Sequence, residues 1–311
     1  MEPNESHTAG RDGTRIWWRS RGRGSPAVVL TDGIACSGFV WKYLEPALAG
    51  QRRVLRWHYR GHGRSEMPRD PARVSVLDCV DDLLAVLDAA GEQRAVLAGH
   101  SMGVQVCLEA HRAAPGRVAG LLLVCGSPGR PLDTFHDQPW LARAFPVLKY
   151  LVETFPAAAR LIFEKVVPSE IVYQVGSALE VNRSLVRRED LLPYLEQVSR
   201  LDPVFFARMM SVAAAHDATD HLKDVDVPTL VVAGAKDTWT PLWLSERMHA
   251  AIPACELLVL PGGTHVGPIE HPELVQLRVE KFLRERVPGG DRAPATPRVK
   301  RRAARRAIPP R

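Results

Sequence analysis

The chain has 311 residues, of which 46% are hydrophobic and 24% charged, which is ordinary for a globular protein and excludes a low-complexity chain. Its longest apolar run, residues 118–125, is too short to cross a bilayer, and its polar N-terminus lacks the apolar segment of a secretory signal. The formal net charge is +6, but residues 288–311 hold eight basic residues and one acid, so residues 1–287 sum to −1 and exclude a basic nucleic-acid-binding domain.

The most informative segment is the sequence G-H-S-M-G, from Gly99 to Gly103. Apolar residues 95–98 predict a buried strand before it, and residues 104–111 predict a helix after it. A serine on so sharp a turn has a strained backbone, and a flanking glycine lets the neighbouring elements approach because it has no Cβ. The pattern therefore predicts Ser101 as a nucleophile above the C-terminal edge of a sheet.

Between residues 126 and 227 the apolar residues have the spacing of helices rather than of buried strands. Leu148, Leu151 and Phe155 recur at helical spacing, and Ile162 and Val166 repeat the four-residue step. We expect an inserted set of helices over residues 128–226. Its aromatic residues should mostly form the core of the insertion, and a few should line an apolar pocket: Phe135, Trp140, Phe145, Phe155, Phe163, Tyr173, Tyr194, Phe205 and Phe206.

Two further predicted strands precede the base and the carboxylate that a serine nucleophile needs. Residues 228–234 predict a buried strand that ends just before Asp237. Residues 256–260 predict a second strand, which leads to His265. Both side chains would then lie on the same sheet edge as Ser101. A base must take the proton of the serine, and a carboxylate must orient that base. We therefore predict a catalytic triad of Ser101, His265 and Asp237.

From about residue 13 to residue 287 the chain resembles the α/β-hydrolase family, in particular its cap-bearing, esterase-like branch. The order Ser101, Asp237, His265 carries the resemblance, together with the first-strand segment at residues 12–18 and the loop R-G-H-G-R-S at residues 60–65. It implies a mostly parallel sheet with flanking helices. The core would comprise residues 1–127 and 227–287, with a helical cap at residues 128–226.

The family also implies an oxyanion hole built from two backbone N–H groups. One belongs to Met102, the residue after the nucleophile, and by resemblance Ile34 supplies the other from the loop at residues 31–38. This loop departs from the family because Asp32 stands where a histidine is usual before the glycine. Two interpretations are open: Asp32 accepts hydrogen bonds from loop amides, or its carboxylate faces the pocket and opposes an oxyanion.

Gly33, His100 and Trp239 flank the predicted triad and are candidate substrate-binding residues. The five cysteines show neither disulfide-framework nor metal-ligand spacing, and no dinucleotide or phosphate-loop motif is present. We therefore predict no metal and no cofactor. Free thiols favour a reducing compartment, so the expected location is cytoplasmic.

Residues 288–311 follow Val287, begin with Pro-Gly-Gly and are rich in Pro, Ala and Arg, so we expect a disordered basic tail. Two interpretations are open. The tail could attract polyanions or an acidic membrane surface through its charge, or it could be a solvated extension without a partner.

The leading hypothesis is a serine hydrolase that cleaves an ester or related acyl bond of a small, largely apolar substrate through an acyl-serine intermediate. A serine at residue 101 disfavours the relatives that use an aspartate nucleophile. C–C bond hydrolases, perhydrolases, lactonases and acyltransferases share the same triad, and these alternatives stay open because a fold does not fix the substrate. A small-molecule sensor on a hydrolase scaffold is the competing class.

Overall fold

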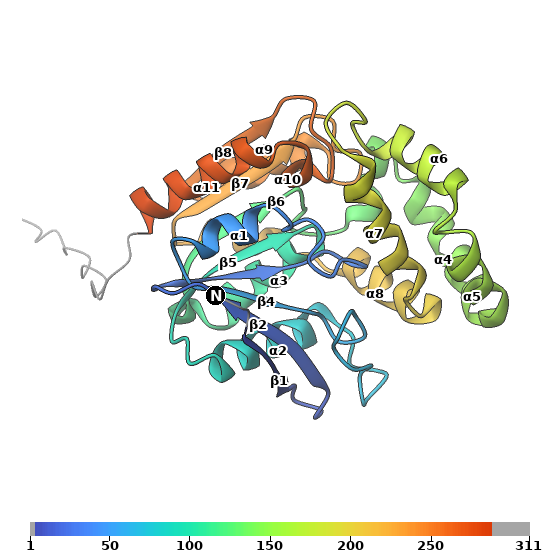
Figure 1. Cartoon of the computed structure of the whole chain (residues 1–311), viewed down its shortest axis with the longest axis horizontal. Helices are drawn as coiled ribbons and strands as arrows, with labels where there is room; N and C mark the ends of the chain where they lie inside the picture. The colour runs from blue at the N-terminus through green and yellow to red at the C-terminus, as the bar shows by residue number, and fades with distance from the viewer. Residues whose placement is uncertain (1–3, 288–311) are drawn as a thin grey trace, which may run out of the picture.

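Eight strands form one sheet in the computed structural model, which describes residues 4–287 (Figure 1). Their order across the sheet is β1-β2-β4-β3-β5-β6-β7-β8. β1 and β2 pair antiparallel, as do β2 and β4, whereas the remaining neighbours are parallel. The strands span Asn4–Ala9 (β1), Arg15–Arg21 (β2), Ala27–Thr31 (β3), Val54–Trp57 (β4), Ala95–His100 (β5), Val118–Val124 (β6), Thr229–Gly234 (β7) and Cys255–Leu260 (β8). The predicted α/β architecture with a mostly parallel sheet is confirmed.

The central strands are buried on both faces. Every residue of β3, β5, β6 and β7 is buried, which explains why these strands appear in the sequence as continuous apolar runs. β1 was not predicted, since its sequence N-E-S-H-T-A has exposed or half-buried side chains. It pairs along the edge of β2, where backbone hydrogen bonds form without an apolar pattern.

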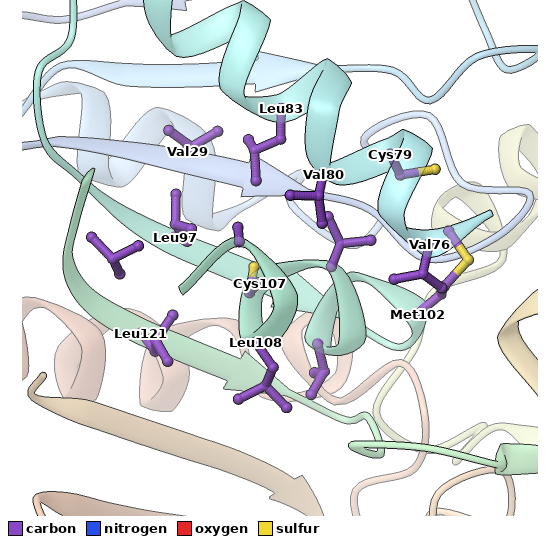
Figure 2. Packing of buried hydrophobic residues seen from close by; sticks show 14 of the residues in the cluster. Val29, Val76, Cys79, Val80, Leu83, Leu97, Met102, Cys107, Leu108 and Leu121 are labelled. Carbon is purple, nitrogen blue, oxygen red and sulfur yellow. The ribbon is translucent and has the colours of Figure 1, made fainter. Parts of the chain in front are cut away.

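Helices cover both faces of the sheet. The apolar sides of α2 (Val76–Ala89), α3 (Met102–Ala113) and α9 (Leu242–Ala251) pack on one face, and those of α1 (Leu44–Ala49) and α11 (Pro272–Arg286) on the other. Figure 2 shows Val80 and Leu83 of α2 and Leu108 of α3 near Val29, Leu97 and Leu121 of the sheet. A capping box between Ser75 and Asp78 starts α2. This packing fixes the position of α3, whose first residue follows Ser101.

Five helices between β6 and β7 form what we call the helical insertion, residues 140–215. They gather at one end of the sheet, on the right of Figure 1. They are α4 (Trp140–Thr154), α5 (Pro156–Lys165), α6 (Glu170–Glu180), α7 (Arg188–Ser199) and α8 (Pro203–Ala215). Short 3-10 turns flank them at Pro131–Asp133 (η2), Phe135–Asp137 (η3) and Thr219–Asp224 (η4), η1 (Pro115–Arg117) precedes β6, and α10 (Gly267–Glu270) precedes α11.

The aromatic residues of this region only partly form a core, in contrast to the prediction. Phe135 and Phe205 are buried, but Trp140 and Phe155 are 51% and 58% exposed. α4 buries none of its residues. The helical spacing of apolar residues predicts that α4 has an apolar face, but it does not predict whether another element covers that face. No helix within residues 4–287 is long and apolar enough to cross a membrane. The predicted basic tail lies outside the described residues.

Candidate active site

Ser101 occupies the turn between β5 and α3. Its φ of 55° and ψ of −119° lie outside the regions that residues with a side chain prefer. A Cβ at Gly99 would lie 2.2 Å from the carbonyl oxygen of Gly103, and a Cβ at Gly103 would lie 2.6 Å from that of Thr31. Only glycines therefore fit on either side of the turn. The turn presents the Ser101 hydroxyl beside the N-terminus of α3, where the helix dipole favours negative charge.

His265 lies on the loop after β8, between Ser101 and Asp237. Its Nε2 is 3.0 Å from the Ser101 Oγ, and its Nδ1 is 3.1 Å and 3.0 Å from the two carboxylate oxygens of Asp237. An imidazole that carries its proton on Nδ1 donates to Asp237 and can accept the serine proton at Nε2. The three residues singled out from the sequence are thus brought together at the C-terminal edge of the sheet.

Asp237 is buried but well satisfied. Its Oδ1 accepts hydrogen bonds from the N–H groups of Trp239 and Thr240, both at 2.9 Å, and its Oδ2 accepts one from the Thr240 hydroxyl at 2.8 Å. Burial raises the pKa of Asp237, but His265 and the hydrogen bonds from Thr240 outweigh it and hold this pKa below its ordinary value. The carboxylate is therefore ionised at neutral pH and holds His265 in one tautomer.

Two unused backbone donors lie beside the nucleophile. In the loop after β3, the N–H of Ala35 donates to His62, whereas those of Cys36 and Gly38 donate to Gly33 and Asp32 within the loop. For the N–H of Ile34, no acceptor is found within residues 4–287. Met102 is the first residue of α3, so its N–H has no acceptor inside the helix. Ile34, Met102 and Ser101 line the same cavity.

The Asp32 carboxylate does not line that cavity. It is 2% exposed, and its Oδ2 accepts the N–H of Gly38 at 2.7 Å, closing the loop on itself. The Tyr59 hydroxyl donates to the Asp32 carbonyl oxygen at 2.7 Å. Burial raises the pKa of Asp32 to about 7, against the attraction of the nearby Arg56 guanidinium. These contacts favour the first interpretation from the sequence, in which Asp32 accepts hydrogen bonds from loop amides.

The active-site cavity has a volume of about 290 Å³. It joins the sheet edge to the inner sides of α6, α7 and α8. All the candidate substrate-binding residues line it, and most of the other lining side chains are apolar. The residues from the sheet edge are Gly33, Ile34, His100, Ser101, Met102, Trp239 and His265, and those from the insertion include Val172, Tyr173, Leu191, Tyr194, Phe206 and Met210.

His100 supports the loop that carries His265. It is 3% exposed, and its Nε2 lies 2.9 Å from the His265 carbonyl oxygen, to which it donates when the ring is neutral. Burial, with His265 nearby, lowers the pKa of His100 to about 3, so the ring stays neutral. His100 thus fixes the backbone of the residue that contacts the nucleophile.

Sequence reasoning missed Glu270, which fixes the same loop from the other side. Its buried carboxylate accepts the N–H and the hydroxyl of Thr264 and the N–H of Asn182 in the insertion. One side chain therefore ties α10, the residue before His265 and the insertion together. In the sequence, the sole indication of this role is that Glu270 follows the predicted base His265 by five residues. Acidic residues at such a distance are common, so this spacing does not predict the contact. Among residues 4–287, no three His, Cys, Asp or Glu side chains are grouped to hold a metal ion.

Comparisons with known proteins agree with this architecture. A model described as the alpha/beta hydrolase family matches residues 28–276. The chain is 29% identical over 287 residues to the dihydrolipoyllysine-residue acetyltransferase component of the acetoin cleaving system of Pseudomonas putida, covering 91% of this chain and 70% of that protein. It is 27% identical over 264 residues to a candidate carbamate hydrolase, RutD, of Azorhizobium caulinodans, covering 83% and 91% of the two chains.

A thermophilic esterase from Thermogutta terrifontis shares the fold with a TM-score of 0.74 at 23% identity, over 91% of this chain and 98% of the esterase. The strand order, the turn at Ser101 and the family match over most of the chain point to one conclusion. The chain belongs to the α/β-hydrolase family.

Proposed function

We propose that this hydrolase is a serine enzyme that cleaves an ester or a related acyl bond of a small, largely apolar substrate through an acyl-Ser101 intermediate. The observation that carries the proposal is the hydrogen-bonded row from Ser101 Oγ to His265 Nε2 and from His265 Nδ1 to Asp237. This row opens into the active-site cavity, where a substrate carbonyl can reach Ser101.

In the first half-reaction, His265 Nε2 takes the proton of Ser101 as Oγ bonds to the substrate carbonyl carbon. The carbonyl oxygen becomes an oxyanion, and the N–H groups of Ile34 and Met102 donate to it. His265 then gives its proton to the leaving alcohol oxygen while the carbon–oxygen bond breaks. The products of this step are a free alcohol and an ester on Ser101.

In the second half-reaction, water enters where the alcohol left. His265 takes one proton from this water as its oxygen bonds to the acyl carbon, and the oxyanion again forms beside Ile34 and Met102. Collapse of this intermediate returns the proton from His265 to Ser101 Oγ and releases the carboxylic acid. Asp237 stays ionised throughout and stabilises the imidazolium that forms twice.

The helical insertion supplies the substrate pocket in this proposal. Together with its flanking segments it forms the cap, residues 128–226, in which α6, α7 and α8 contribute apolar walls opposite Ser101. Tyr173, Tyr194 and Phe206 contact the apolar part of the substrate, while Gly33, His100 and Trp239 surround its carbonyl end. An apolar pocket with few polar groups favours esters with alkyl or aryl acyl chains over charged substrates.

A fluorophosphonate probe and a series of p-nitrophenyl esters of increasing acyl length test the proposal. We expect the probe to label the wild-type protein and not Ser101→Ala, and we expect turnover to depend on acyl length. Ser245→Ala changes a buried serine of α9 that does not line the active-site cavity, so it serves as the matched control. It should retain both labelling and turnover.

The same panel separates the alternatives. Relatives described as a carbamate hydrolase, an enol-lactonase and an acetyltransferase component justify including an aryl carbamate, a lactone and an acyl-acceptor alcohol. A folded wild-type protein that is neither labelled nor active on any of these would overturn the proposal and favour a small-molecule sensor.

A further inference from the structure

A second cavity of about 420 Å³ lies apart from the active site and shares no lining residue with it. It lies between the antiparallel edge of the sheet and the end of α7. Its walls come from β1, β2 and β4, from the loops after β3 and β4, and from the chain at residues 197–201. The proposed function makes no use of this cavity.

The cavity gathers positive charge. The strand register places Glu5 opposite Arg19, and Arg19 opposite Arg56. Arg64 and Arg200 complete the set of lining arginines, and Glu5 is the one carboxylate among the described residues that line the cavity. Like charges on directly opposed strand residues repel, so this arrangement is costly unless negative charge lies nearby.

Internal carboxylates balance only part of this charge. Glu45 accepts hydrogen bonds from Arg19 at 2.9 Å and 2.6 Å and from Arg56 at 3.2 Å, while Glu5 pairs with Arg64. The side chain of Arg200 has no ion pair or hydrogen bond within residues 4–287. The four guanidinium groups that line the cavity are therefore balanced by only two carboxylates, those of Glu5 and Glu45.

Asp32 is a third acidic residue near the cavity, and its carboxylate is attracted to the Arg56 guanidinium. It is turned to Gly38, and burial raises its pKa to about 7, so it is only partly ionised at neutral pH. The net charge around the cavity is therefore between +1 and +2, which suits a mono- or dianionic guest.

Two buried donors in the wall also lack acceptors. His58 is 4% exposed, and its Nδ1 accepts the N–H of Arg64 at 3.0 Å, so its ring proton is on Nε2. Neither this Nε2 nor the Nε of Arg56 has a hydrogen-bond partner in the described part of the chain. The guanidinium carbons of Arg56 and Arg64 lie 5.6 Å and 5.5 Å from the centre of the Trp17 ring, so one side chain gathers both cations.

We propose that the second cavity binds a small phosphate-type oxyanion, inorganic phosphate or the phosphate group of a monoester. The guanidinium groups of Arg56, Arg64 and Arg200 provide the charge, because their forked N–H donors match phosphate oxygens.

An anion bound here would link two parts of the molecule. Ser37, near the end of the loop that carries Ile34, lines the cavity together with Leu201, which follows α7. A Cβ at Gly38 would lie 2.1 Å from Arg56 Nη1, so this guanidinium packs directly against the loop backbone. Phosphate binding should therefore tie the loop after β3 to the insertion and raise the temperature of unfolding.

Titration calorimetry with inorganic phosphate on the full chain tests the proposal, at an ionic strength held constant with potassium chloride. We expect saturable binding to the wild-type protein in the micromolar to low millimolar range. The double variant Arg64→Ala/Arg200→Ala should lose roughly tenfold to a hundredfold in affinity, because each charge-assisted hydrogen bond contributes strongly.

The control removes the same charge elsewhere. Arg143→Ala/Arg188→Ala changes two exposed arginines of the insertion and should bind phosphate as the wild type does. The basic residues 288–311 are present in every variant, so their own attraction for phosphate cancels in the comparison. Circular dichroism checks the fold, and the single variants Arg64→Gln and Arg200→Gln replace the double variant if it does not fold.

Equal affinity of the wild-type protein and the Arg64/Arg200 variants would overturn the proposal, as would the absence of saturable binding to the wild type. Ser101→Ala should still bind phosphate. Failure of the esterase assays would therefore leave this result unaffected, and failure of phosphate binding would leave the proposed hydrolysis unaffected.

Discussion

The Nε2 of His62 accepts a hydrogen bond from the backbone N–H of Ala35, 3.2 Å away, in the middle of the loop that carries Ile34. The other ring nitrogen, Nδ1, lies 3.1 Å from the Arg60 carbonyl oxygen, to which it donates. Ala35 has a φ of 64°, which a residue with a side chain rarely adopts. His62 therefore holds a strained residue next to a proposed oxyanion donor and acts as a positioning residue.

Replacing His62 with alanine should lower kcat on p-nitrophenyl esters by roughly tenfold to a hundredfold with little change in KM, because a misplaced donor stabilises the oxyanion less. Burial lowers the pKa of His62 to about 4, so the ring remains an acceptor from mildly acidic to alkaline pH. The ratio of wild-type to variant kcat should consequently stay constant over that range. His7→Ala, on the edge strand β1, is the control. A defect confined to KM would contradict this role.

Asp237→Asn tests the orienting carboxylate. The amide keeps much of the shape, but it can turn its N–H₂ group toward His265 and favour the tautomer with the proton on Nε2, which cannot accept from Ser101. In serine proteases the equivalent change costs about 10⁴ in kcat, and we expect a loss of that order here. Steady-state kinetics and a thermal melt measure it. A variant with wild-type kcat would show that Asp237 does not orient the base.

The catalytic residues were predictable because their chemistry imposes local patterns. Ser101 needs glycines at fixed positions. Asp237 follows an apolar run that forms the buried strand β7, and His265 follows the largely apolar run of β8, whose residues are mostly half-buried. The order of these runs was enough to place three residues on one sheet edge. Their distances came only from the structure, and the tautomer of His265 is inferred from those distances.

Other features leave no such mark in the sequence. His62 and Glu270 accept hydrogen bonds from the backbone N–H groups of Ala35 and Asn182, which lie far from them along the chain, and no periodicity in the sequence indicates such contacts. The edge strand β1 is polar because solvent reaches both of its sides. Phe155 repeats at helical spacing like a core residue, yet nothing packs over it well enough to bury it. In each case tertiary contacts decide what the local pattern cannot.

Asp32→Asn should stabilise the protein more at alkaline than at acidic pH. The unfolded chain releases the Asp32 proton near the ordinary aspartate pKa of 3.8, whereas the folded protein keeps it until about pH 7. Wild-type stability is therefore lost as the pH rises through this window, and asparagine removes that loss while its side-chain oxygen still accepts from Gly38. Between about pH 5 and pH 8 the advantage of the variant should grow by up to about 3 kcal/mol.

Urea unfolding at the two pH values measures this difference. Asp224→Asn changes an exposed aspartate without an ion pair among residues 4–287, so it should show no comparable dependence on pH. If the stability of Asp32→Asn stayed parallel to that of the wild type, the carboxyl would already be ionised in the folded protein at acidic pH.

Gly176 offers a test of the pocket itself. It lies in α6 and lines the active-site cavity, and a Cβ placed on it meets no heavy atom within 4 Å. Leucine is also a better helix former than glycine by up to about 1 kcal/mol, so Gly176→Leu should fold at least as well as the wild type. Its side chain should occupy space that the acyl chain of a long ester needs.

We expect kcat/KM of Gly176→Leu to fall roughly tenfold or more for an octanoate ester relative to the acetate ester, since the loss of one or two buried contacts has that size. Gly116→Leu is a matched control, because a Cβ at Gly116 also meets nothing within 4 Å and this residue does not line the cavity. If both variants kept the acyl-length preference of the wild type, α6 would not border the site where the acyl chain binds, and only α7 and α8 of the insertion could form the acyl pocket.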